Sequence, residues 1–178
     1  MIIISLGSNV AGRWGDPATT IRHALNVLNR RGITVLCYSA LYRTSPYGVI
    51  DQPVFLNAAA AVRTALPPVA LLSVLKEIEA ESGRTQSRRW GPRTLDIDII
   101  DYNARILNGP KGSRQRHKHG TPRLILPHPE IQSRPFVLQP MVDIAPYWHH
   151  PASGKSVAQL IAALRLRQAG QILDVIDR

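Results

Sequence analysis

Cysteine is almost absent from this 178-residue chain, which contains only Cys37. A single cysteine excludes an internal disulfide framework, and it excludes zinc sites that need two or four thiolates. Cys37 falls in an apolar pattern typical of a strand, so we expect its side chain to be buried as a small hydrophobe.

Long hydrophobic runs are also missing. No apolar stretch approaches the roughly 18 residues that a membrane-spanning helix requires. The first residues, MIIIS, lack the basic start and the longer apolar segment of a secretory signal. These absences predict a cytoplasmic protein with no membrane partner. The length predicts a single domain over residues 1–178, which we expect to be a monomer.

Acidic residues are missing from two windows that carry most of the net charge of +10. Residues 84–93 contain four arginines, and residues 108–121 contain two lysines and two arginines. The surplus charge is therefore local. The second window is also rich in glycine and has no apolar periodicity, so it predicts a basic loop insert.

Aromatic residues make up only 6% of the chain, which bears on nucleic-acid binding. Sheets that recognise RNA carry aromatic side chains on their inner strands. The first apolar run, MIIISL, has none. A sheet-type nucleic-acid-binding module is therefore an alternative that we keep, but we expect no nucleic-acid partner.

The side chains that indicate chemistry are concentrated in residues 88–101, RRWGPRTLDIDIID. Asp96 and Asp98 alternate with apolar residues, which predicts a strand with both carboxylates on one face, about 6 to 7 Å apart. Two adjacent carboxylates repel each other unless a cation lies between them, and hard oxygen ligands favour Mg²⁺ that also bridges to phosphate. The alternative is a solvated polar face on an edge strand.

The arginines just before this strand supply matching anion sites. Arg89 and Arg93 lie on either side of the Gly91–Pro92 turn, and their planar guanidinium groups can each donate two hydrogen bonds to a phosphate. Carboxylates and arginines together predict a site for a metal and a polyphosphate.

Hydrophobic periodicity predicts an α+β fold with the order β-α-β-β-α-β. The expected strands are 1–6, 33–42, 54–62 and 95–102, and the expected helices run from Pro17 to Gly32 and from 67 to 82. This order is the ferredoxin-like arrangement, an antiparallel sheet with two helices packed on one face. Expected C-terminal additions are a short strand at 124–126, a loop at 140–146 and a helix at 156–166. Gly7 to Asn9 is expected to form a turn that supports its neighbours.

Four separated blocks carry a resemblance that spans nearly the whole chain. They are LGSN at 6–9, TSPYGVIDQPVFLNAA at 44–59, GRTQSRRWGPRTLDIDII at 83–100 and LPHPEIQSRPFVLQP at 126–140. Together they resemble the 6-hydroxymethyl-7,8-dihydropterin pyrophosphokinase family, whose signature is the run RWGPRTLDIDI. The resemblance implies an ATP-dependent enzyme of folate biosynthesis that transfers pyrophosphate to the hydroxymethyl oxygen of a reduced pterin and releases AMP.

The resemblance also implies the residues of the nucleotide site. Two Mg²⁺ ions would bind Asp96 and Asp98 and clamp the triphosphate of ATP. Arg93 and Arg134 would bind phosphate. The remaining residues implied on the nucleotide side are Glu79, Arg89, Ile99 and His128.

For the pterin, the resemblance implies that Phe55 and Phe136 sandwich the ring. Asn57 and Thr44 would form hydrogen bonds with its edge, and Trp90 would close over the site and exclude water. Considered without the family, the two phenylalanines would be assigned to the core.

The chain departs from the family pattern in three places. Phe55 stands where some members have tyrosine, and the insert 108–121 is longer than the usual link. The arginine loop is one residue shorter than the commonest spacing, so the roles of Arg88 and Arg89 stay open. A Mg²⁺-dependent phosphohydrolase is the alternative within the enzymes, and its product would be inorganic phosphate.

Overall fold

The computed structural model describes the whole chain except residues 47–50, 86–90, 109–123, 165–169 and 177–178. The basic insert expected at 108–121 lies almost entirely outside the described residues. The strands are β1 (Ile2–Ser8), β2 (Thr34–Tyr38), β3 (Leu41–Thr44), β4 (Phe55–Arg63), β5 (Asp96–Tyr102) and β6 (Ile172–Ile176). The helices are α1 (Pro17–Arg30), α2 (Pro68–Glu81), the short 3-10 turn η1 (Ile131–Ser133), α3 (Pro135–Ile144) and α4 (Val157–Leu164).

The strands form one six-stranded sheet in which the pairs are antiparallel. The order is β5-β1-β4-β3-β6, and β2 also pairs with β4. Elements β1 to β5 follow the predicted β-α-β-β-α-β order, with the second strand divided in two. The predicted α+β, ferredoxin-like core is confirmed.

The first helix begins where its sequence predicts. The Asp16 carboxylate accepts a hydrogen bond from the Thr19 N–H at 2.9 Å, and Pro17 occupies the first helical position, where its missing N–H costs nothing. The apolar residues of α1 at helical spacing are buried against the sheet. Within the described parts of the chain, no helix has both the length and the apolar character to cross a bilayer.

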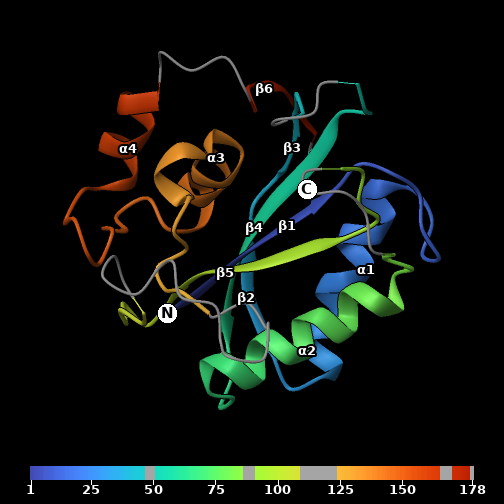
Figure 1. Cartoon of the computed structure of the whole chain (residues 1–178), viewed down its shortest axis with the longest axis horizontal. Coiled ribbons are helices and arrows are strands. Elements are labelled where there is room, and N and C mark those ends of the chain that lie inside the picture. Colours follow the sequence, from blue (N-terminus) through green and yellow to red (C-terminus); the bar gives the residue numbers. More distant parts are fainter. Residues whose placement is uncertain (47–50, 86–90, 109–123, 165–169, 177–178) are drawn as a thin grey trace.

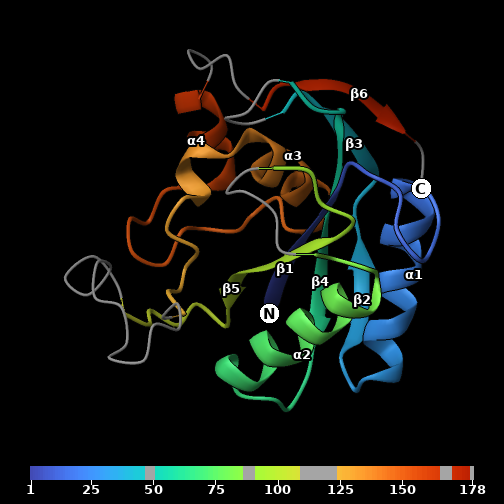
Figure 2. The ribbon, with the colours of Figure 1, turned by 45° about the vertical axis from the view of Figure 1, so that its right-hand side comes forward.

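The sheet is covered on both faces, as Figure 1 and Figure 2 show. Alternation along β1 sends Ile2, Ile4 and Leu6 into a core with α1 and α2. Ile3 points the other way, into a second core with α3 and α4. The ferredoxin-like expectation covers only the first face, so α3 and α4 are the additions that create a second one.

The expectation of one strand over 33–42 is wrong in detail. The segment divides into β2 and β3, and the register of β2 against β4 shifts between Val35 and Cys37. Cys37 is exposed, which corrects the prediction that it is buried. In the part of the chain that the structure describes, β2 pairs only with β4 and most of its side chains face solvent. An apolar pattern in this strand therefore does not indicate burial.

Two C-terminal expectations also change, and one strand was not expected. Residues 140–146 were expected to form a loop, but α3 continues through Pro140 to Ile144. One lost backbone hydrogen bond is tolerated because Val137, Leu138 and Met141 are buried on the same helix. Leu126 makes an isolated bridge to Leu107 in place of a strand at 124–126. The unexpected strand is β6, which pairs with β3.

Candidate active site

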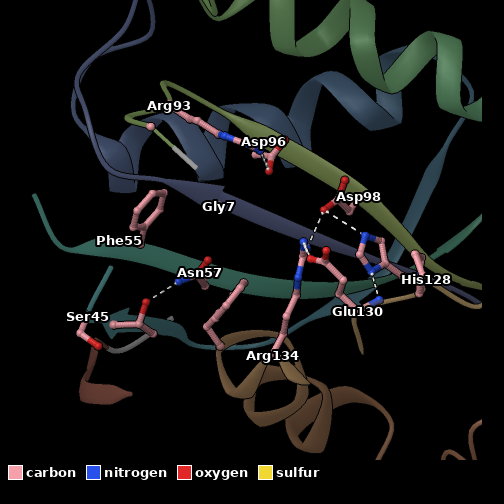
Figure 3. A pocket seen from close by; sticks show the side chains of 14 residues that line it. Gly7, Ser45, Phe55, Asn57, Arg93, Asp96, Asp98, His128, Glu130 and Arg134 are labelled. Atoms are coloured by element: carbon pink, nitrogen blue, oxygen red, sulfur yellow. Dashed lines mark hydrogen bonds and ion pairs between the residues drawn. The ribbon is translucent and has the colours of Figure 1, made fainter. Parts of the chain in front are cut away.

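A cavity of about 320 Å³ opens on the sheet face that carries α3. It lies where β1, β4 and β5 meet the N-terminal end of α3, and Figure 3 shows its lining side chains. The lining residues are Gly7, Thr44, Ser45, Phe55, Asn57, Gly91, Arg93, Asp96, Asp98, His128, Pro129, Glu130, Arg134 and Phe136. Nine predicted site residues, from four separate segments of the chain, therefore surround one space.

Gly7 forms part of the cavity floor. It is paired with Asn57 of β4 on one side and with Asp96 of β5 on the other. A Cβ atom at position 7 would lie 3.0 Å from the Asn57 Oδ1. The turn expected from Gly7 onwards therefore begins later, and the missing side chain keeps the space between the amide and the carboxylate open.

Ser8 and Asn9 do support their neighbours, as predicted. The Ser8 hydroxyl donates to the Thr94 carbonyl at 2.5 Å. The Asn9 side-chain oxygen accepts from the Arg93 N–H at 2.7 Å, and the Asn9 N–H donates to the Arg93 carbonyl at 3.0 Å. These bonds fix the backbone from which Arg93 enters the cavity.

Asp96 and Asp98 project from the same face of β5, which confirms the predicted alternation, since Ile97 between them is fully buried on the other face. The Asp96 carboxylate accepts from the Arg84 guanidinium at 2.6 Å, and it is also paired with Arg93. Burial alone would raise the pKa of Asp96, but the cations Arg93, Arg84 and Lys76 outweigh burial and hold its pKa below the usual range. Asp96 is therefore an anion at neutral pH.

Asp98 has a separate set of partners. Arg134 donates to it from Nη1 at 3.2 Å, and the His128 Nε2 lies 3.8 Å from the same carboxylate oxygen. The His128 Nδ1 accepts a hydrogen bond from the Glu130 N–H at 3.2 Å, so Nε2 is the nitrogen that can carry a proton toward Asp98. Burial lowers the pKa of His128 against the opposing pull of Asp98.

Arg134 is the residue just before α3, and its guanidinium pairs with two acids, as the dashed lines in Figure 3 show. Besides Asp98 it is paired with Glu130 through Nη2. Among the described residues, its Nε is buried without a hydrogen-bond partner. In the described structure both terminal nitrogens of Arg134 are thus engaged by acids, and only the buried Nε lacks a partner.

The other end of the cavity is aromatic and amide-lined. Phe55 and Phe136 both line it, and the Arg134 guanidinium lies 5.8 Å from the centre of the Phe136 ring. Asn57 donates to the Thr44 hydroxyl at 2.8 Å, so the Thr44 side chain orients the amide. The Asn57 Oδ1 faces the cavity floor above Gly7. This end suits a flat ring with hydrogen-bonding groups on one edge.

The residues expected on the nucleotide side are not all at the cavity. The Ile99 side chain is buried in the core beneath α1 and α2, which leaves only its backbone for a ligand. Glu79 is buried, and in the described structure it is not among the lining residues, because it pairs with Lys76 and Arg84 behind Asp96. Arg89 and Trp90, like Arg88, lie outside the described residues.

Sequence reasoning missed several residues at or behind the cavity. Arg84 was counted in the basic window without a role, although it joins Asp96 to the buried Glu79. Ser45, Glu130 and Gly7 line the cavity and were not selected. A role for Arg84 could have been predicted because residues 84–93 contain no acid to pair with it. Gly7 gave no local signal, because its role depends on strand pairing.

The pair of carboxylates, Asp96 and Asp98, suits one type of divalent ion, Mg²⁺. The described residues contain no group of three or more His, Cys, Asp or Glu side chains that could hold a metal on their own. Asp96 and Asp98 offer two carboxylates beside a cavity with room for further oxygen ligands. This donor set suits Mg²⁺, which keeps several waters and takes its remaining ligands from phosphate.

The α+β sheet carries paired carboxylates that face arginines, and the same cavity has an aromatic end. These features are typical of an enzyme that acts on a phosphorylated substrate and on a second substrate with a flat ring. The family 7,8-dihydro-6-hydroxymethylpterin-pyrophosphokinase (HPPK) matches residues 3–146. The chain belongs to this family and is a pyrophosphokinase of folate biosynthesis, which confirms the resemblance found in its sequence.

Individual relatives agree. A Pseudomonas aeruginosa protein named 2-amino-4-hydroxy-6-hydroxymethyldihydropteridine pyrophosphokinase is 39% identical over 163 residues, covering 91% of this chain and 90% of the relative. A Bacillus subtilis protein of the same name is 41% identical, covering 79% of this chain and 75% of the relative. An Arabidopsis thaliana folate synthesis bifunctional protein is 42% identical over 160 residues, but the chain spans only 30% of its length.

Solved structures support the fold. A crystal structure described as HPPK-DHPS in complex with substrates superposes with a TM-score of 0.63 at 16% identity. The match covers 91% of this chain and 43% of that chain. At this identity the match bears on the fold alone.

Proposed function

We propose that this chain transfers the pyrophosphoryl group of ATP to the hydroxymethyl oxygen of 6-hydroxymethyl-7,8-dihydropterin, with release of AMP. The observation that carries the proposal is that one cavity joins the Asp96–Asp98 end, with its arginines, to the Phe55–Phe136 end. A polyphosphate at the first end and a flat ring at the second would lie next to each other, as group transfer requires.

The arginines are proposed to bind the phosphates. In the described structure Arg93 is paired with Asp96, and Arg134 with Asp98 and Glu130. Both arginines line the cavity, and a polyphosphate there would offer them a more highly charged partner. Arg89 is proposed to join them on the strength of the family motif.

Asp96 and Asp98 are proposed to hold two Mg²⁺ ions. When bound, the ions would neutralise charge on the triphosphate and polarise the phosphorus that is attacked. The two carboxylates are suited to this because the lowered pKa of Asp96 keeps it ionised and because both lie on one face of a rigid strand. His128 and Ile99 are proposed to contact the nucleotide.

Phe55 and Phe136 are proposed to stack on the two faces of the pterin, and Asn57 to form hydrogen bonds with its edge. The support is that Thr44 orients the Asn57 amide and that Gly7 leaves the floor beside it open. Trp90 is proposed to cover the bound substrates. A strong general base is not part of the proposal, because positioning and charge neutralisation carry most of phosphoryl transfer.

Product analysis tests the proposal. Incubation with ATP, Mg²⁺ and the reduced pterin is expected to give AMP and a pterin diphosphate in equal amounts, detected by mass spectrometry. Inorganic phosphate without a modified pterin would indicate the phosphohydrolase instead. A single domain, a monomeric state, a cytoplasmic location and the absence of a nucleic-acid partner stay predictions.

A further inference from the structure

Ile97 lies between the two aspartates, and its backbone N–H and C=O point to the outer edge of β5. In the sheet order of the described residues, β5 is the last strand on its side and pairs only with β1. In an antiparallel strand the N–H and C=O of one residue point to the same edge. Ile97 is fully buried, so its two groups need partners other than water.

Two side chains of α2 provide those partners. The Glu79 Oε1 accepts a hydrogen bond from the Ile97 N–H at 2.7 Å. The Lys76 Nζ donates to the Ile97 carbonyl at 3.2 Å and to the Glu79 Oε1 at 2.6 Å. Lys76 and Glu79 lie one helical turn apart, so α2 presents them together as a substitute for a neighbouring strand.

The position of these bonds matters because peptide units are planar. The Ile97 N–H belongs to the peptide that follows Asp96, and the Ile97 carbonyl belongs to the peptide that precedes Asp98. Holding both groups therefore holds the two peptide planes that set the directions of the Asp96 and Asp98 side chains.

Glu79 also reaches Asp96 through a second route. Its other carboxylate oxygen is paired with Arg84, which donates to Asp96 at 2.6 Å and to the Leu95 carbonyl at 3.3 Å. Glu79 is almost fully buried, whereas an acid of this kind is normally kept in water. Its bonds run to the β5 backbone and to cations rather than into the cavity.

We infer that Lys76 and Glu79 are positioning residues, an edge clamp that fixes the separation and orientation of Asp96 and Asp98 for the proposed metal and polyphosphate. The inference rests on the proposed function, since it assigns a purpose to the spacing of the two carboxylates. It also replaces the expectation that Glu79 contacts the nucleotide.

Lys76→Met tests the clamp, because methionine keeps most of the apolar stem and removes the donor. The expected result is a fall in turnover of about tenfold and a severalfold weaker binding of Mn²⁺, measured by electron paramagnetic resonance with a non-hydrolysable ATP analogue. The KM for the pterin is expected to stay within about twofold of the parent, and Lys76→Arg is expected to restore both properties. Glu77→Gln is the matched control, since Glu77 lies on the same helix and is 59% exposed beside Arg31.

Hydrogen exchange of the Ile97 amide tests the geometry of the clamp without depending on activity. Glu79→Ala removes the acceptor, so the Ile97 amide is expected to exchange with solvent deuterium at least about tenfold faster than in the parent, relative to amides of β4. If the parent forms no pterin diphosphate but the Ile97 amide is protected as described, the proposed function fails while the clamp geometry stands.

Two results would overturn the inference. One is a Lys76→Met enzyme with unchanged turnover and unchanged Mn²⁺ binding. The other is a loss of activity in Lys76→Met that matches the loss of folded protein, with metal binding per folded molecule unaltered, because the pair would then serve stability alone.

Discussion

Gly7 of β1 and Asn57 of β4 are cross-strand partners so closely opposed that a methyl group at position 7 would lie 3.0 Å from the Asn57 Oδ1. The Asn57 amide is held in place from its other side by the Thr44 hydroxyl at 2.8 Å. Asn57 therefore has little freedom to move away from an added side chain. Its position is set by three strands at once.

Gly7→Ala is expected to raise the KM for the pterin by about tenfold, because Asn57 must shift from the position where it meets the substrate edge. The KM for ATP is expected to change little. Steady-state kinetics with each substrate varied in turn makes the measurement, and thermal unfolding serves as the control. Equal effects on the two substrates would argue against Asn57 as a pterin contact.

Asp96→Ala and Asp98→Ala are each expected to lower Mg²⁺-dependent turnover by several orders of magnitude. Both side chains are partly exposed at the cavity, so the folded structure should persist, as circular dichroism can verify. Asp174→Ala, at an exposed position of β6, is the control for losing one acid. Near-normal turnover in either cavity variant would remove the metal assignment.

Phe55→Ala is expected to weaken pterin binding by about 1 to 3 kcal/mol, the scale of one aromatic stacking surface, with ATP binding nearly unchanged. Phe55→Tyr keeps the ring face and should bind the pterin almost as the parent does. Calorimetric titration with each ligand provides both values. A parallel loss of ATP affinity would instead assign Phe55 to the structural core.

His150, which is not among the residues that line the cavity, is expected to make stability depend on pH. It is buried, its Nδ1 accepts from the N–H groups of Ala152 and Ser153 at 3.2 Å, and burial lowers its pKa. The unfolded chain then takes up the proton first as the pH falls below about 6.5, so the contribution to stability is lost between that pH and the lower folded pKa.

His150→Asn should therefore lose less stability than the parent between pH 7.5 and pH 5, measured by urea unfolding at each pH. His149→Asn, at an exposed neighbouring position, should lose as much as the parent. An identical pH response in the parent and His150→Asn would contradict the assignment.

The basic insert is expected to be passive in catalysis, because exposed charges more than about 10 Å from a ligand are largely screened at physiological salt. Replacing residues 110–120 with a short Gly-Ser link should leave turnover and both KM values within a few-fold of the parent. Loss of ATP binding would place Lys111, Arg114, Arg116 or Lys118 in the nucleotide site. Loss of RNA binding with activity retained would reveal a second function.

The order of the core elements could be predicted from the sequence because its cues are local. The Asp16–Pro17 start of α1 and the alternation that puts Asp96 and Asp98 on one face depend only on near neighbours. The motif RWGPRTLDIDI likewise indicated the family directly. Such features are written into a few consecutive residues, so one sequence is enough to read them.

The burial of individual residues, and how far a helix extends, could not be predicted from such local cues. Cys37 lies in an apolar run and is exposed, whereas Glu79 is charged and buried. Pro140 suggested a loop, yet it lies within a helix whose apolar residues pack on the second face of the sheet. In each case the outcome depends on which element packs against the residue, and the residue's own type does not specify that.

The sequence by itself determined the family, the core order of strands and helices, and the face shared by Asp96 and Asp98. Only the tertiary structure decided that Gly7 forms the cavity floor, that Arg84 and Glu79 lie behind Asp96, and that Lys76 supports the edge of β5. The physical reason is range. Periodicity and capping act over a few residues, whereas strand register and the packing of α2 on β5 bring together residues that lie far apart in the chain.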